Sequence, residues 1–162
     1  MYDDHQIRID MRAVKHFRRL RCHRWKQSGH IALWRYKERN YDGWHLTADA
    51  NGCESLAALI EAMMVDGPGA SRSIMIERPT RAVRSVPRSP EWAITVPAAW
   101  QLSVGADISD WRFPETSEYA ELCIGADWLP LLADSVRSIG RGIGDYSIGD
   151  TDGGNLPLWF WR

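Results

Sequence analysis

The chain has 162 residues, of which 44% are hydrophobic and 25% are charged, and its formal net charge is −1. This length suits one domain with a substantial hydrophobic core, and the small net charge gives no general preference for nucleic acid, membranes or acidic partners. The sequence contains no apolar run of the ~18 residues that a membrane span needs, and because the first 30 residues are polar we expect no secretory signal.

The near-neutral total hides two oppositely charged regions. Residues 11–40 carry a net charge of +9, whereas residues 101–162 carry a net charge of −6. Such separated charge favours association between oppositely charged surfaces. One expected arrangement is a homodimer in which the basic arm of one subunit meets the acidic half of another.

Residues 1–28 are interpreted as a basic N-terminal arm or helix, because Val14, Phe17 and Leu20 recur at near-helical spacing among basic residues. Its basic patch consists of Arg18, Arg19, Arg21 and Arg24. A basic amphipathic segment binds RNA or DNA, a protein groove, or the acidic surface of its own domain. These three alternatives stay open from the sequence alone.

The first predicted structural unit covers residues 29–77. Alternating apolar residues predict strands near residues 31–37 and 41–49, with Asp42-Gly43 as the turn of a hairpin. Apolar residues at helical spacing predict a helix over residues 54–64, which the glycines of 67–69 end. A further strand is expected at residues 73–77.

The second predicted unit covers residues 99–162 and repeats this order. Strands are expected at 99–107 and 118–125, followed by a helix that Asp127 caps and Gly140 ends. Short strands then follow at 145–149 and 156–162. The last strand is apolar on both faces, with Trp159 and Trp161 on one and Phe160 on the other, which predicts a central position or a covered edge.

The two predicted helices align at an offset of 73 residues, so we read two repeated β-β-α-β units joined by the connector 78–98. The expected fold class is α+β, with a mainly antiparallel sheet and two helices packed on one face. Residues 29–162 are expected to form this single domain.

Two segments carry a resemblance. The first segment is DGWHLTADANGCESLAALIEAM, from Asp42 to Met63. The second is GDYSIG followed by PLWFW, from Gly144 to Trp161. They resemble a recurring pattern in a family of small bacterial proteins to which no activity is assigned. The first segment is also similar to immunity proteins of bacterial toxin systems, which often pair such a strand with a short helix. The resemblance covers roughly residues 30–162 and supplies no catalytic residues.

The three cysteines are odd in number and widely spaced, which favours a reducing bacterial cytoplasm over an oxidised, secreted scaffold. Cys53 lies just before a predicted helix, where a thiol can become a nucleophile, and His45 is the base nearest in sequence. A buried, inert Cys53 explains the sequence equally well.

We expect no metal and no cofactor. The glycine-rich run 139–155 follows a helix instead of preceding one, unlike a dinucleotide or phosphate loop. The histidines and cysteines of the arm lack zinc spacing, and the acids Asp145, Asp150 and Asp152 do not fit a calcium loop.

An acidic surface for a basic partner is the favoured functional interpretation of the second unit. Nine tryptophans are present, most at predicted core positions, while Trp92 and Trp111 fall in connectors and are candidate interface anchors. The proposed partner-binding residues are Trp92, Trp111, Asp107, Asp110, Glu115 and Glu118. The same acids, with Glu121, are alternatively paired catalytic carboxylates.

The sequence therefore leads to three functional hypotheses. The first is a non-catalytic protein-binding module, specifically a bacterial immunity or antagonist protein. The second is a small hydrolase-like enzyme with an acidic or Cys53-based cleft, and the third is a nucleic-acid-associated protein that uses the basic arm.

Overall fold

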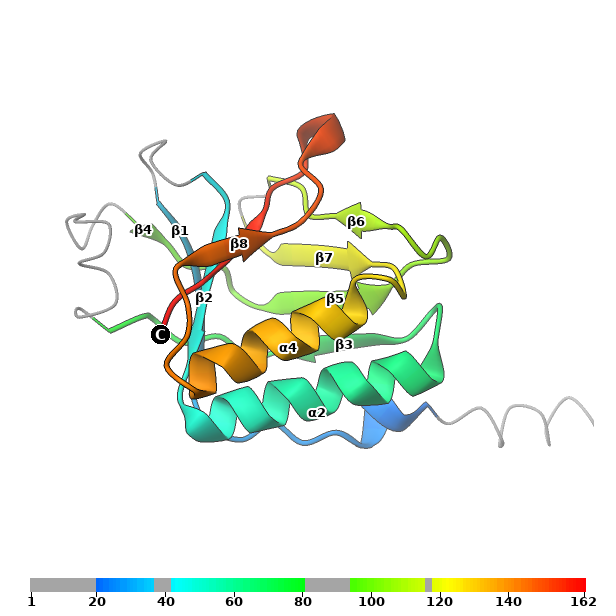
Figure 1. Cartoon of the computed structure of the whole chain (residues 1–162), viewed down its shortest axis with the longest axis horizontal. Helices are drawn as coiled ribbons and strands as arrows, with labels where there is room; N and C mark the ends of the chain where they lie inside the picture. Colours follow the sequence, from blue (N-terminus) through cyan, green and yellow to red (C-terminus); the bar gives the residue numbers. More distant parts are fainter. Residues whose placement is uncertain (1–19, 37–41, 81–93, 116–117) are drawn as a thin grey trace, which may run out of the picture.

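The computed structural model describes residues 20–36, 42–80, 94–115 and 118–162. In these ranges the chain forms nine strands and two α-helices, with strands and helices interspersed, which confirms the expected α+β class (Figure 1). The strands form two sheets, where the sequence predicted one. Five of the strand pairings are antiparallel and two are parallel.

The first sheet has five strands in the order β4-β1-β2-β9-β8. Its members are β1 (Ile31–Tyr36), β2 (Trp44–Ala48), β4 (Ile94–Thr95), β8 (Tyr146–Ile148) and β9 (Leu158–Phe160). The predicted hairpin is confirmed, because β1 and β2 pair antiparallel with Ile31 opposite Ala48. The central position of the last strand is also confirmed, since β9 lies between β2 and β8.

The second sheet has four strands in the order β3-β5-β7-β6. Its members are β3 (Ser71–Ile74), β5 (Trp100–Val104), β6 (Trp111–Arg112) and β7 (Ala120–Ile124). Alternate residues of β5 and β7 are buried, as their period of two requires. Their buried faces consist of Trp100, Leu102, Val104, Ala120, Leu122 and Ile124.

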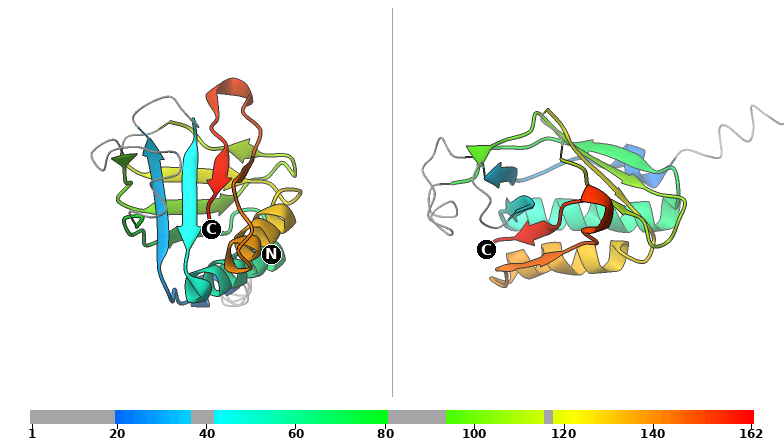
Figure 2. Two further views of the ribbon diagram at one scale, coloured as in Figure 1. Left: turned by 60° about the vertical axis from the view of Figure 1, so that its left-hand side comes forward. Right: turned by 90° about the horizontal axis from the view of Figure 1, so that it is seen from above.

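Two helices cover one face of the four-stranded sheet, α2 (Ala50–Asp66) and α4 (Leu129–Gly140) (Figure 2). Asp49 caps α2 by accepting a 2.7 Å hydrogen bond from the Gly52 amide, and Gly67 is its C-cap. The expected cap of α4 was wrong: the N-cap is Trp128, with no side-chain capping bond, and Asp127 lies one residue earlier. Pro130 occupies the first turn, where its missing N–H has no helical acceptor.

Each helix carries the chain from one sheet to the other. The first unit runs from β2 through α2 to β3, and the second runs from β7 through α4 to β8, so the two crossovers go in opposite directions. The strand-strand-helix-strand order thus recurs as predicted. The strand pairing differs, because β1 and β2 are antiparallel, whereas β5 and β7 are parallel and β6 intervenes in the sequence.

The described end of the N-terminal arm belongs to the folded domain. The short 3₁₀-helix η1 (Arg21–Arg24) places its Arg21 and Cys22 amides 2.7 and 2.8 Å from the Asp66 carboxylate, and Cys22 is completely buried. The indole of Trp25 donates to the Ser55 carbonyl. The domain therefore includes residues 20–28, earlier than the expected boundary at residue 29, while residues 1–19 lie outside the described ranges.

A second, smaller core lies on the other face of the five-stranded sheet. We call it the aromatic cluster, and it consists of Trp34, Tyr36, His45, Trp159 and Trp161. Trp34 and His45 have no exposed surface. Successive residues of β2 point to opposite faces, so Trp44 and Leu46 pack in the main core while His45 enters the aromatic cluster.

In the part of the chain that the structure describes, no helix is long and apolar enough to cross a membrane.

Candidate docking surface

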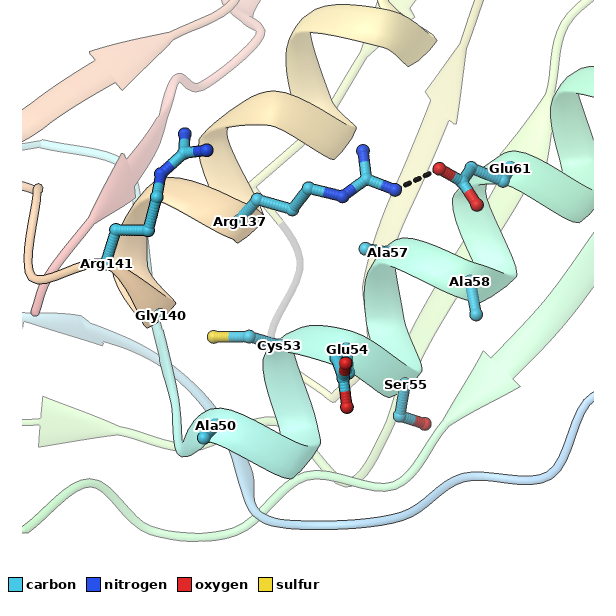
Figure 3. Close-up of a pocket in the computed structure, with 10 residues that line it drawn as sticks. All are labelled: Ala50, Cys53, Glu54, Ser55, Ala57, Ala58, Glu61, Arg137, Gly140 and Arg141. Atoms are coloured by element: carbon cyan, nitrogen blue, oxygen red, sulfur yellow. Dashed lines mark hydrogen bonds and ion pairs between the residues drawn. The ribbon is translucent and has the colours of Figure 1, made fainter.

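A groove of about 900 Å³ separates the outer faces of α2 and α4 (Figure 3). Its lining includes Cys53, the residue considered as a nucleophile. Cys53 is in the first turn of α2 and is only 4% exposed. Its thiol lies 3.7 Å from the Ala48 carbonyl.

Burial raises the pKa of Cys53 to about 11, and the nearby Asp49 carboxylate adds to the increase. The thiol is therefore protonated at neutral pH, opposite to what a helix N-terminus alone would produce. His45 does not lie where it could take the proton of Cys53, because its ring points into the aromatic cluster on the opposite face of β2. The Cys53-based cleft thus has neither a thiolate nor the histidine that the sequence offered.

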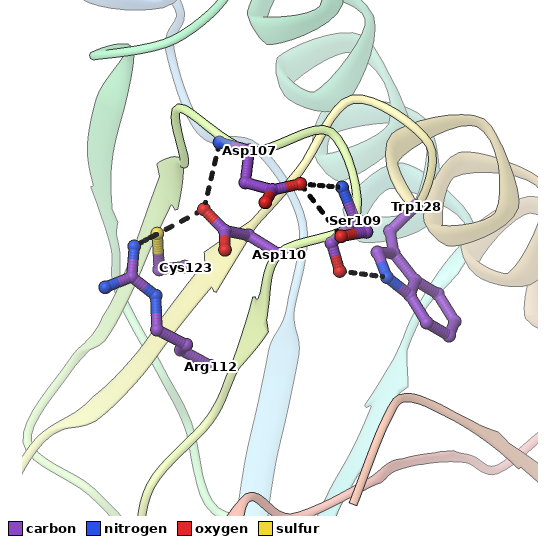
Figure 4. A network of polar contacts seen from close by, with 6 residues as sticks. All are labelled: Asp107, Ser109, Asp110, Arg112, Cys123 and Trp128. Atoms are coloured by element: carbon purple, nitrogen blue, oxygen red, sulfur yellow. Dashed lines mark hydrogen bonds and ion pairs between the residues drawn. The ribbon is translucent and has the colours of Figure 1, made fainter. Parts of the chain in front are cut away.

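The loop between β5 and β6 is built around two aspartates (Figure 4). Asp107 accepts hydrogen bonds from the amide and the hydroxyl of Ser109, at 2.9 and 2.8 Å. These two donors lower the pKa of Asp107 because they stabilise its charged form. The Asp110 carboxylate accepts a 3.2 Å hydrogen bond from the Asp107 amide. The loop therefore holds a fixed carboxylate at its exposed tip.

This loop lies against the N-terminal end of α4. The Asp127 amide donates to the Ile108 carbonyl at 2.9 Å, and the Trp128 indole donates to the Ser109 carbonyl at 3.2 Å. Apolar side chains remain exposed here: Ile108 is 60% exposed and Leu131 is 44% exposed. Trp128, one helical turn before Leu131, is half-buried.

Exposed acids neighbour these apolar residues along the chain. Asp107 precedes Ile108, Asp127 precedes Trp128, and Asp134 lies one turn after Leu131, all three exposed. We call this region the acidic docking surface, and define it as Asp107, Ile108, Asp127, Trp128, Leu131 and Asp134. It combines exposed apolar side chains with exposed carboxylates, the two components of a polar-rimmed protein interface.

The structure separates the acids that the sequence grouped. Asp110 lies beside the acidic docking surface, but its side chain is only 22% exposed and is 3.5 Å from the guanidinium of Arg112. Glu115 forms a 3.1 Å ion pair with Arg35. Glu118 precedes β7, at the opposite end of that strand from Asp107, and its carbonyl accepts from the Ala98 amide.

The prediction that Trp111 lies in a connector and is an exposed interface anchor is wrong. Trp111 is on β6, is 3% exposed, and donates its indole N–H to the Leu156 carbonyl at 3.0 Å. Gly149 packs against its ring, which leaves no surface for a partner. Trp92 lies outside the described residues. The tryptophan beside the acids is Trp128, which the sequence placed in the core.

Of the predicted basic patch, Arg21 and Arg24 are exposed on η1, whereas Arg18 and Arg19 lie outside the described residues. The segment is held by its backbone, through the Asp66 carboxylate, so both arginine side chains face solvent. In the ranges that the structure covers, no three His, Cys, Asp or Glu side chains are grouped to hold a metal ion.

Ile108, Trp128 and Leu131 were missed as functional residues because their apolar character predicts burial. The one available signal was the spacing of Leu131 and Asp134, which places them on one outward face of α4, with Asp127 just before the helix. Comparison of the chain with known proteins gave no matching family model, no matching curated protein and no matching solved structure.

Proposed function

We propose that this protein is a non-catalytic binding module, of the bacterial immunity or antagonist kind, that captures a basic protein. The supporting observation is the acidic docking surface, where exposed Ile108 and Leu131 and half-buried Trp128 lie among three exposed carboxylates. Aromatic and apolar side chains supply binding energy at interfaces. Carboxylates around them accelerate encounter with a cationic partner and select against acidic ones.

Two features of the described residues favour this function over the enzyme alternative. The pKa of Cys53 is raised, and that of Asp107 is lowered by its hydrogen bonds, so Cys53 is a poor nucleophile and Asp107 is a poor general acid.

The three free cysteines support a reducing, cytoplasmic location. For the nucleic-acid alternative, the described residues offer Arg21 and Arg24 on one 3₁₀ turn, and the half-buried ring of neighbouring Trp25 is already covered by the Arg72 guanidinium.

The test uses the product of the gene adjacent to this one, because immunity proteins bind toxins encoded beside them. The full chain is co-expressed with that protein and the complex is measured by calorimetry. We expect Asp107→Lys with Asp127→Lys to weaken binding by at least about tenfold, since two attractive contacts become repulsive. Wild-type affinity should also fall as salt rises.

Glu121→Lys is the matched control, because Glu121 is an exposed acid on the outer face of β7, away from the docking surface. It should leave binding within about twofold of wild type, since only a general change in net charge remains. The proposal is wrong if the adjacent protein forms no complex, or if both variants weaken binding equally.

A further inference from the structure

We infer that the groove between α2 and α4 is an interface for a second copy of this chain, in a two-fold dimer. The two rims of the groove carry opposite charge. Glu54 and Glu61 lie on the α2 side, and Arg137 and Arg141 lie on the α4 side (Figure 3). A surface with one acidic and one basic edge is complementary to a rotated copy of itself.

Two contacts fix which charges lie at the same level along the antiparallel helices. Arg137 forms an ion pair with Glu61 across the groove. Gly140 approaches Cys53 so closely that a Cβ at Gly140 would lie 3.5 Å from the Cys53 Cβ. Glu54 and Arg141 follow these two residues in opposite directions along the helix axes, so they lie within about 3 Å of the same level.

A two-fold axis parallel to the helices would place α2 of each subunit over α4 of the other. The rotation preserves position along the axis, so Glu54 faces the partner subunit's Arg141, and Glu61 faces the partner subunit's Arg137. Four ion pairs form by symmetry across an isologous interface. A two-fold axis that lies in the interface plane but runs perpendicular to the helices would instead place opposite ends of the two grooves over one another. The ion pairs between the subunits would then be lost.

The floor of the groove permits close approach. It includes the small residues Ala50, Ala57, Ala58 and Gly140, which leave room for a second helix beside the Arg137–Glu61 pair that crosses the groove. The rim charges are also available for new pairs. The side chains of Glu61 and Arg137 are 55% and 39% exposed, and in the described part of the chain Glu54 makes no ion pair, while Arg141 donates to the Ser138 hydroxyl.

The test uses two complementary double variants of the full chain. The first carries Glu54→Lys and Glu61→Lys, and the second carries Arg137→Glu and Arg141→Glu. Each variant alone places like charges opposite one another and should be a monomer. Mixed together, lysines at 54 and 61 of one chain face glutamates at 137 and 141 of the other, so the mixture should form a heterodimer.

Sedimentation equilibrium measures all three samples and the wild type. The expected result is a wild-type dimer, two monomeric variants and a dimeric mixture, with circular dichroism showing that both variants are folded. Glu121→Lys with Arg112→Glu, on the outer face of the four-stranded sheet, is the control and should remain a dimer. A monomeric wild type, or a mixture that stays monomeric, overturns the inference.

These residues are separate from the acidic docking surface. The double variants should therefore keep their affinity for the basic partner, and the Asp107 and Asp127 variants should keep the dimer. Failure of the dimer and failure of the proposed function are thus distinguishable.

Discussion

The indole N–H of Trp161 donates a 2.8 Å hydrogen bond to Nδ1 of His45 inside the buried aromatic cluster. The two rings are also stacked, with centroids 5.8 Å apart. Because Nδ1 accepts this bond, a neutral His45 carries its proton on Nε2. The link joins β2 to the residue that follows β9, and so reinforces the parallel pairing of two strands that are far apart in the sequence.

Trp161→Phe should lower the free energy of unfolding by about 1–3 kcal/mol, because it leaves a buried acceptor on His45 without this donor while keeping an aromatic ring. Urea unfolding followed by circular dichroism measures the change. Trp128→Phe is the control, since its indole bond to Ser109 lies at a half-exposed position. Equal costs for the two variants would show that the buried hydrogen bond contributes nothing particular.

The carboxylate of Asp49 joins the start of α2 to the start of β1. It accepts from the Gly52 amide at 2.7 Å and from the His30 amide at 3.0 Å. Asp49→Ala should cost about 1 kcal/mol, because both amides lose an acceptor, whereas Asp49→Asn keeps a capping oxygen and should cost less.

The same bonds lower the pKa of Asp49 below its ordinary value of 3.8. Its charged form therefore adds stability above that pH, and the contribution disappears as the pH falls through the lower pKa of the folded state. Urea titrations at several acidic pH values should show wild type and Asp49→Asn converging. A difference that grows on acidification would contradict this account.

Local patterns were enough to predict most elements. The alternation of Trp100, Leu102 and Val104 located β5 and its buried face, and Asp42-Gly43 located the β1–β2 hairpin. These predictions succeed because side-chain period and turn chemistry act over a few residues. The two apolar faces of β9 even indicated its central position.

Long-range pairing could not be predicted in the same way. The division into two sheets depends on β9 adding to β2 and on β3 adding to β5, and neither pairing leaves a local signal. The candidate site was predicted less well than the strands and helices, for a related reason. Trp111 looked like a connector residue because β6 has only two residues, and Trp128 looked buried because most tryptophans are.

His30 should have a raised pKa in the folded protein. Its Nδ1 contacts the Glu77 carboxylate, and this hydrogen bond is the main reason that the pKa is above 6.5. The pair therefore adds stability below pH 6.5, which is lost as the pH rises through the folded-state pKa. NMR titration should show Glu77→Gln lowering the His30 pKa and Glu54→Gln leaving it unchanged. An unchanged pKa in Glu77→Gln would exclude the contact.

The three cysteines should differ in reactivity. Cys22 and Cys53 are buried and their pKa values are raised, whereas Cys123 is half-exposed with its sulfur 3.2 Å from the guanidinium of Arg112. Iodoacetamide at pH 7.5 should therefore label the folded protein at Cys123, and Cys123→Ser should abolish rapid labelling. Mass spectrometry identifies the site, and early labelling of Cys53 would contradict its burial.

Gly149→Ala should be strongly destabilising, because Gly149 packs against the edge of Trp111. Its φ is +130°, and an added Cβ would lie 2.5 Å from Cε2 of that ring. Trp111 has no room to withdraw, since it is buried and its indole N–H bonds to the Leu156 carbonyl. We expect a loss of about 2 kcal/mol or more in the free energy of unfolding.

Gly142→Ala separates the steric clash from backbone strain. Gly142 also has a positive φ, +76°, but an added Cβ there would meet nothing within 4 Å. Its cost should be limited to the ~1–2 kcal/mol of a left-handed backbone, with tryptophan fluorescence unchanged. Gly149→Ala should cost more and shift the fluorescence, because the ring it displaces is buried and lies 5.1 Å, centroid to centroid, from the Trp128 ring. Equal costs and unshifted spectra would mean that an added Cβ at Gly149 does not displace the Trp111 ring.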